Sequence, residues 1–147
     1  MPPTVVTSTF PRTIAITPHE TGPVHTSLTW RPLDAAAVTT TIRNGADRPV
    51  TWWISRDLLH AGLTRQVGDG DITIGPLLAE DDDGNVIEDP THIEVALRSP
   101  AGIGGNLSLL YLAAALQQFL DRTHQQVPAG AEYYEWSHTD LFRRETA

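Results

Sequence analysis

The 147-residue sequence contains no cysteine and no lysine, and each absence excludes a group of chemistries. Without cysteine there can be no disulfide, cysteine-ligated zinc site, iron–sulfur cluster or thiolate nucleophile. Without lysine there can be no Schiff base, P-loop lysine or kinase-type phosphate-binding lysine. The chain must therefore act through other side chains or through its surface.

Long apolar runs are also missing, so no transmembrane helix is expected, and the N-terminus lacks the pattern of a secretory signal. These features predict a cytoplasmic protein. The mass of 16.1 kDa fits one domain over residues 1–147, with residues 1–10 expected to be flexible. The 18 acidic residues exceed the 10 arginines by 8, and this net charge argues against nucleic acid or an anionic membrane as a partner.

The first two-thirds of the chain has the pattern of β-strands. Alternating or β-branched residues predict strands over 13–17, 24–30, 37–43, 50–55, 71–74 and 92–98, with Pro76 ending the fifth. In the strand over 50–55, period 2 places Trp52 in the core and Trp53 on the opposite face. Two alternatives are open for Trp53: an exposed interface contact, or cover by another element of the same chain.

Helices are predicted mainly near the C-terminus. A short helix over 55–62 has Ser55 as its N-cap and Gly62 as the residue that closes it. A long helix over 107–125 follows Asn106, and a last short helix is expected over 135–144. Strands followed by helices predict an α+β class, with antiparallel sheets packed on one long and one or two short helices.

The long predicted helix has more apolar surface than one small sheet needs, and this predicts a homo-oligomer. The residues that form the second apolar flank, together with the exposed tryptophan, are the candidate oligomer contacts: Trp53, Leu107, Leu110 and Tyr111.

Templates for catalysis and metal binding fail on this sequence. The acidic stretch over 79–90 lacks the ligand spacing of a calcium loop and is interpreted as a hairpin loop with a turn at Asp83-Gly84. The six histidines show neither the helical zinc spacing nor an HExxH motif, and no serine lies in a nucleophile elbow. The glycines over 102–105 lack the full dinucleotide fingerprint. We therefore expect no cofactor, no metal and no enzymatic activity.

Five blocks of residues, in order over about 22–140, resemble the motifs of the SsgA-like sporulation and cell-division regulators of actinobacteria. The blocks are Leu28-x-Trp30 with Asp34, Ala37 and Val38; Val50-x-Trp52 followed by Arg56-Asp-Leu-Leu59 and Gly62-Leu63; Gly68-x-Gly70-Asp71-Ile-x-Ile74-x-Pro76; Ala96-Leu97-x-Ser99-Pro100-x-Gly102; and Phe119-Leu-x-Arg122-Thr123 with Val127-Pro-x-Gly130-x-Glu132. Ala35-Ala36 and Ile54-Ser55 depart from the family pattern, which suggests a divergent member.

The resemblance implies a non-enzymatic regulator of sporulation-specific cell division that acts in the cytoplasm at the division septum. It further implies an adaptor that recruits or controls the tubulin-like protein FtsZ, or contacts other SsgA-like proteins. The implied fold is similar to that of the Whirly-type proteins, in a homo-oligomer expected to be a trimer. Single-stranded nucleic-acid binding of the Whirly type is the alternative function, which the acidic charge disfavours.

Within the motifs, most residues are interpreted as packing residues, whereas Arg56 and Asp57 are expected to be more open. Arg56 and Asp57 are candidates for a local ion pair, a helix cap or a bridge between subunits. The complete set of motif residues with structural or interface roles is Trp52, Arg56, Asp57, Leu58, Leu59, Gly62, Leu63, Gly70, Asp71 and Arg122.

Overall fold

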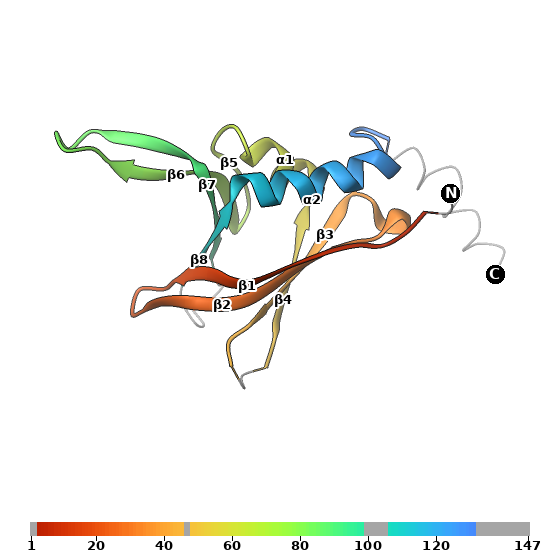
Figure 1. The fold of residues 1–147 in the computed structure, drawn as a ribbon, viewed down its shortest axis with the longest axis horizontal. Coiled ribbons are helices and arrows are strands. Elements are labelled where there is room, and N and C mark those ends of the chain that lie inside the picture. Colours follow the sequence, from red (N-terminus) through yellow and green to blue (C-terminus); the bar gives the residue numbers. More distant parts are fainter. Residues whose placement is uncertain (1–2, 46–47, 99–105, 132–147) are drawn as a thin grey trace.

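The computed structural model describes residues 3–45, 48–98 and 106–131, which form one eight-stranded antiparallel sheet with both helices on one side of it (Figure 1). The strands in chain order are β1 (Val6–Ile16), β2 (Thr21–Trp30), β3 (Ala37–Arg43), β4 (Val50–Ser55), β5 (Val67–Asp69), β6 (Ile72–Glu80), β7 (Val86–Arg98) and β8 (Asn106–Leu112). The helices are the 3-10 turn η1 (Pro32–Asp34), α1 (Arg56–Gly62) and α2 (Ala113–Gln126).

The strand order is β4-β3-β2-β1-β8-β7-β6-β5, so the sheet consists of two meanders joined in the middle. β1 to β4 pair consecutively in the first meander, β5 to β8 pair consecutively in the second, and β1 pairs with β8. The two edge strands are β4 and β5, and α1 lies between them in the chain. The short helix therefore connects one edge of the sheet to the other.

The α+β class is confirmed, but there is one sheet, and several strands are longer than predicted. β1 begins at Val6, which is 3% exposed and pairs with Trp30, so residues 6–10 are not the flexible segment that was expected. Pro76 does not end β6, because the pairing with β7 shifts register between Pro76 and Leu77 and then continues to Glu80. A register shift lets a strand accommodate a residue that has no N–H to donate.

The predicted long helix over 107–125 is wrong in its first third, residues 107–112, which belong to strand β8. Leu109 and Tyr111 are buried, whereas Leu110 between them is half-buried, and this alternation with period 2 is that of a strand. Leucine-rich segments satisfy both periods, so packing between β1 and β7 decides the outcome. The glycines over 102–105 and the predicted helix over 135–144 lie outside the described residues.

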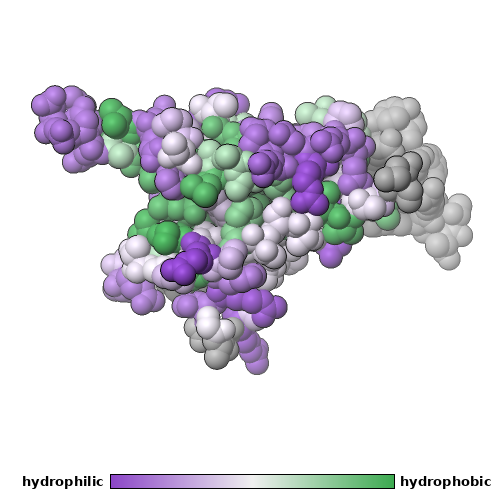
Figure 2. Space-filling view, in the orientation of Figure 1, coloured by the Kyte–Doolittle hydropathy of each residue, from purple (hydrophilic) through white to green (hydrophobic). Residues whose placement is uncertain are grey.

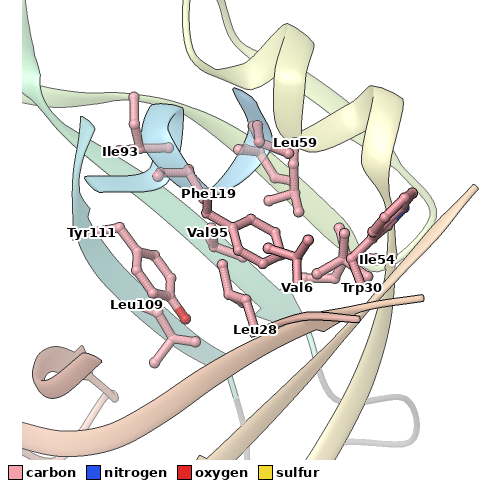
Figure 3. Packing of buried hydrophobic residues seen from close by; sticks show 14 of the residues in the cluster. Val6, Leu28, Trp30, Ile54, Leu59, Ile93, Val95, Leu109, Tyr111 and Phe119 are labelled. Carbon is pink, nitrogen blue, oxygen red and sulfur yellow. The ribbon is translucent and has the colours of Figure 1, made fainter. Parts of the chain in front are cut away.

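The hydrophobic core lies between the sheet and the helices. A row of side chains crosses four strands in register, from Ala15 through Leu109 and Val95 to Ile74, and all four are buried. α2 covers this side of the sheet with Leu116, Phe119 and Leu120. Figure 3 shows Phe119 in the middle of the cluster, with residues from several strands around it.

Buried hydroxyl groups are the polar part of this core. The Tyr111 hydroxyl donates to Thr26 Oγ1 at 3.1 Å, and Thr26 Oγ1 lies 2.8 Å from Thr13 Oγ1. The Phe10 ring contacts the Tyr111 ring edge-on, with 5.1 Å between centroids. Burial raises the pKa of Tyr111 to about 12, because the phenolate would lose its hydration there, and the hydrogen bond to Thr26 offsets only part of this effect.

The hairpin of β6 and β7 extends from the body of the molecule and ends in an acidic tip (Figure 1). Only residues 81–85 form the loop, so the acidic stretch over 79–90 is mostly strand rather than loop. The predicted hairpin turn is confirmed: the Gly84 N–H donates to the Asp81 carbonyl at 3.0 Å, and Gly84 has a φ of 82°. The N–H groups of Asn85 and Asp83 donate to the Asp81 carboxylate and lower its pKa. In Figure 2 the tip is hydrophilic, with apolar residues directly behind it.

Candidate interaction site

The segment from β4 into α1 contains the densest motif, and its N-cap is as predicted. The Ser55 side chain accepts a hydrogen bond from the Leu58 N–H at 3.2 Å. This bond satisfies one of the amides that a helix leaves unpaired in its first turn. The cap fixes where the strand ends and the helix begins. It therefore sets the position of Arg56, the first residue of α1.

Arg56 is buried, which corrects the expectation that it is open. Its exposed fraction is 0%, and its guanidinium carbon lies 5.5 Å from the centroid of the Trp30 ring. Nη1 donates to Thr123 Oγ1 on α2, and Nη2 donates to the Pro128 carbonyl, each at 3.4 Å. The side chain therefore connects α1, β2 and the end of α2 within one subunit, and a bridge between subunits does not fit its burial.

Gly62 is the last residue of α1 rather than a residue beyond its end, so the predicted capping role is wrong. Its function is close packing: a Cβ at this position would lie 2.3 Å from Ile74 Cγ2 and 2.8 Å from Ile74 Cβ. Only glycine allows the helix to approach β6 this closely. Gly62 thus serves a helix–sheet contact.

The remaining motif residues divide between core and surface. Leu59 is buried, and Trp52, Leu58 and Leu63 are partly buried and packed against the core, in agreement with the packing interpretation. Gly70, with a φ of 61°, and Asp71 form the turn between β5 and β6, and the Asp71 carbonyl accepts from the Arg98 N–H at 2.8 Å. The exposed motif residues are Asp57, Gly70, Asp71 and Arg122.

The four candidate oligomer contacts lie in different environments. Trp53 is 66% exposed on β4, so the exposed alternative holds within this chain. Leu107 and Leu110 are half-buried on β8, and Tyr111 is buried in the core, where it cannot contact another subunit. Because these three residues belong to a strand, the argument from an overly apolar helix no longer supports an oligomer.

One open hollow brings exposed motif residues and Trp53 together. It encloses about 500 Å³ and is lined by Val50–Trp53 of β4 on one side and by Asp69, Asp71 and Ile72 on the other. Sequence reasoning missed Thr51 and Asp69 as members of this group. The signal for Asp71 was the family motif, whereas only the curvature of the sheet brings its two edges near each other.

Catalytic and metal sites find no support in the described ranges. No group of three or more His, Asp or Glu side chains there is placed to hold a metal ion. The fold does bring His60 of α1 and His124 of α2 into edge-on contact, with 5.1 Å between ring centroids. On β7, His92 Nδ1 lies 3.2 Å from the Asp89 carboxylate. His138 lies outside the described residues.

A membrane-spanning role for a helix is likewise unsupported. Among the described residues, neither helix has the length and apolar character needed to cross a bilayer. A second hollow, of about 300 Å³, lies at the ends of the hairpins β1–β2 and β3–β4, where Glu20 and Arg48 contribute its charged groups. Among the described residues, the exposed Trp53 and the carboxylates of Asp69 and Asp71 lie together at the sheet edges.

Comparison with known proteins identifies the family. Residues 24–132 match the model of the family described as "Streptomyces sporulation and cell division protein, SsgA". The chain is 36% identical over 119 residues to the sporulation-specific cell division protein SsgB of Streptomyces coelicolor, which covers 81% of this chain and 77% of the relative. It is 35% identical over 99 residues to SsgB of Thermobifida fusca, and this match covers 67% of this chain and 64% of the relative. The chain belongs to the SsgA family, which confirms the resemblance found in the sequence.

Solved structures agree with this assignment. A structure of SsgB from Streptomyces coelicolor has a TM-score of 0.70 and 31% identity, and the match covers 90% of this chain and 95% of that one. The structure of the SsgA-like sporulation-specific cell division protein from Thermobifida fusca has a TM-score of 0.79 and 29% identity, and the match covers 99% of this chain and 97% of that one. The curled antiparallel sheet with two helices is therefore the architecture of this family.

Proposed function

We propose that this protein is a non-enzymatic regulator of sporulation-specific cell division that acts as an adaptor at the septum. The observation that carries the proposal is the family match over residues 24–132, together with relatives named as sporulation-specific cell division proteins. In the described residues, no group of three or more His, Asp or Glu side chains is placed to hold a metal ion. The exposed Trp53 and two carboxylates lie instead at an open sheet edge, which suits a protein that binds other proteins.

The proposed partner is FtsZ, and co-sedimentation tests this directly. Purified protein is mixed with FtsZ polymers assembled with GTP and then centrifuged, with GDP samples and the protein alone as controls. We expect the protein in the pellet only when polymers are present. A bacterial two-hybrid screen extends the test to the factors that anchor FtsZ to the membrane. Absence of binding to FtsZ and to all of these factors would refute the adaptor role and leave the fold assignment intact.

The predicted homo-oligomer and the Whirly-type fold similarity belong to this proposal as well. Light scattering after gel filtration measures the mass, and a trimer of about three times 16.1 kDa is expected. The nucleic-acid alternative has weaker support, because the net charge is −8 and Arg56 is buried in the core. Fluorescence anisotropy with labelled single-stranded oligonucleotides at low salt decides between the two, and salt-sensitive binding would favour the alternative.

A further inference from the structure

Two open hollows that share Asp69 lie between the two edges of the sheet and together form a groove. The first part is the hollow between Val50–Trp53 and Asp69, Asp71 and Ile72. The other part is a hollow of about 390 Å³, which Asp69, Val67 and Gly68 line on one side and Ser55 and the exposed side of α1 line on the other. We call this groove, between β4 and residues 67–72, the β4–β5 seam. A six-residue strand such as β4 is about 20 Å long, which is the length of a short extended peptide.

The outer edge of β4 has a defined set of backbone groups. Beside β4 the register with β3 is regular, and the Arg56 N–H donates to the Ala36 carbonyl at 2.9 Å. Hydrogen-bonded and non-hydrogen-bonded pairs alternate along an antiparallel ladder. The backbone groups of Ile54 and Trp52, two and four residues before Arg56, therefore also bond to β3. The N–H and C=O groups of Thr51 and Trp53 therefore point away from β3, toward the seam. An edge with such groups is a template for another strand.

The side chains that line the seam indicate which kind of partner strand would be complementary to it. Trp53 is 66% exposed at one wall, and Trp52 packs partly into the core beside it. The opposite wall carries the exposed carboxylates of Asp69 and Asp71, and Arg65 is the one cationic residue among those that line the two hollows. An arginine in a paired strand would meet the carboxylates and the tryptophan rings together, since a guanidinium both pairs with carboxylates and stacks on aromatic faces.

A second copy of this chain is a poorer occupant. If two seams faced each other about a two-fold axis, the carboxylates of Asp69 and Asp71 would lie near those of the other copy. The edge residues of β4, from Val50 to Ser55, include no cation that would offset this repulsion. The complementary partner is a basic segment of a different protein.

We propose that the β4–β5 seam binds an extended, arginine- or lysine-containing segment of a partner protein, which adds a strand to β4 and places its cation against Asp69 and Asp71. This inference rests on the proposed adaptor function and specifies the surface through which the adaptor works. Main-chain hydrogen bonds to Thr51 and Trp53 supply strand pairing, and the carboxylates select the basic side chain.

Peptide titration followed by NMR tests the seam without FtsZ. The full-length ¹⁵N-labelled protein is titrated with an eight-residue peptide in which valine alternates with arginine and threonine. A second peptide has glutamate in place of arginine, and a third carries N-methyl groups on the amides of one edge, which prevents strand pairing. We expect saturable shifts at the Thr51, Trp53, Asp69 and Asp71 amides with the first peptide, and affinities at least about tenfold lower with the other two.

Matched protein variants locate the contact. Thr51→Pro removes an outward N–H that β3 does not use, and the double variant Asp69→Asn/Asp71→Asn removes two charges. Each is expected to weaken binding of the arginine peptide about tenfold or more. Asp82→Asn/Asp83→Asn removes the same charge from the hairpin tip and is expected to leave the affinity unchanged. If Thr51→Pro fails to fold, as thermal melting would show, the Asn variants still decide the question.

Several results would overturn the proposal. These are shifts that map to α2 or to the hairpin tip, equal weakening by the Asp82/Asp83 variant, and undiminished binding of the N-methylated peptide. Shifts at the same amides on raising protein concentration alone, with a larger mass by light scattering, would identify a second copy as the occupant and would also overturn it. If FtsZ binds while every peptide result is negative, the seam is refuted and the adaptor function stands.

Discussion

On the side of the sheet that the helices cover, β2 places Thr26, Leu28 and Trp30, all fully buried, whereas on the other side the same strand places His25, Ser27 and Thr29. The difference continues across the first meander. Its outer face carries two rows in register, which are Thr9–Ser27–Thr41–Thr51 and Thr7–Thr29–Thr39–Trp53. Threonine has a high β-propensity and adds no large apolar surface, so these two rows are polar except for Trp53. The hydrophobic core therefore lies on the covered face, and Trp53 is the one aromatic residue of the two outer rows.

Replacing Arg56 with Ala should give the largest effect on the covered face. The change empties a fully buried volume beside Trp30 and removes hydrogen bonds to Thr123 and Pro128, so the free energy of unfolding should fall by about 3 kcal/mol or more. Urea denaturation measures this. The matched control is Arg43→Ala on the exposed face, for which a change within about 0.5 kcal/mol is expected. Equal effects of the two substitutions would remove the contrast between the faces.

Gly62→Ala is expected to have the next largest effect. The new methyl group would meet the Ile74 side chain at 2.3 Å, so α1 must move away from β6, and about 2–3 kcal/mol of stability should be lost. Gly22→Ala is the control, because a Cβ there meets no atom within 4 Å. A melting temperature of Gly62→Ala as high as that of Gly22→Ala would show that the helix–sheet contact tolerates a side chain.

Alkaline pH should weaken the covered face through Tyr111. The native pKa of about 12 lies above the ordinary tyrosine pKa of about 10, so between these values the unfolded chain releases the proton while the native protein keeps it. Stability is therefore fully present below pH 10 and is lost as pH rises toward 12, by roughly 2–3 kcal/mol.

Tyr111→Phe isolates this contribution. The variant should lose about 1 kcal/mol at pH 7, because the hydrogen bond to Thr26 is gone, and should show a smaller decrease between pH 9 and 12. Urea denaturation at pH 7, 9, 10.5 and 12 measures both. Parallel pH profiles for the two proteins would mean that Tyr111 is not the group responsible.

Local patterns predicted much of the architecture. The turn at Asp83-Gly84, the Ser55 cap and the strand over 37–43 depend on neighbouring residues, and all three are found. The segment over 107–112 was misjudged because leucines satisfy both a strand and a helix period, and only pairing with β1 and β7 selects the strand. Similarly, Pro76 was taken as the end of a strand, since a bulge depends on the partner strand rather than on the local sequence.

The motif residues show the same division. The sequence motif identified Arg56 and Gly62 as residues of interest. It predicted, however, that Arg56 is open and that Gly62 caps the helix. Their burial comes from contacts with Trp30, Thr123 and Ile74, which lie far away in the chain. Asp69 and Thr51 drew no attention, because nothing in their local sequence shows that the two edges of the sheet border one groove.

By itself the sequence determined the family, the excluded chemistries of cysteine and lysine, the acidic charge and most of the strands, because these depend on residue types and short-range spacing. Tertiary structure alone decided that the Arg56 guanidinium is a core group, that the first third of a predicted helix is a strand, and that β4 and residues 67–72 border one acidic seam. These outcomes depend on which distant residues the curved sheet brings together, and no local pattern records that.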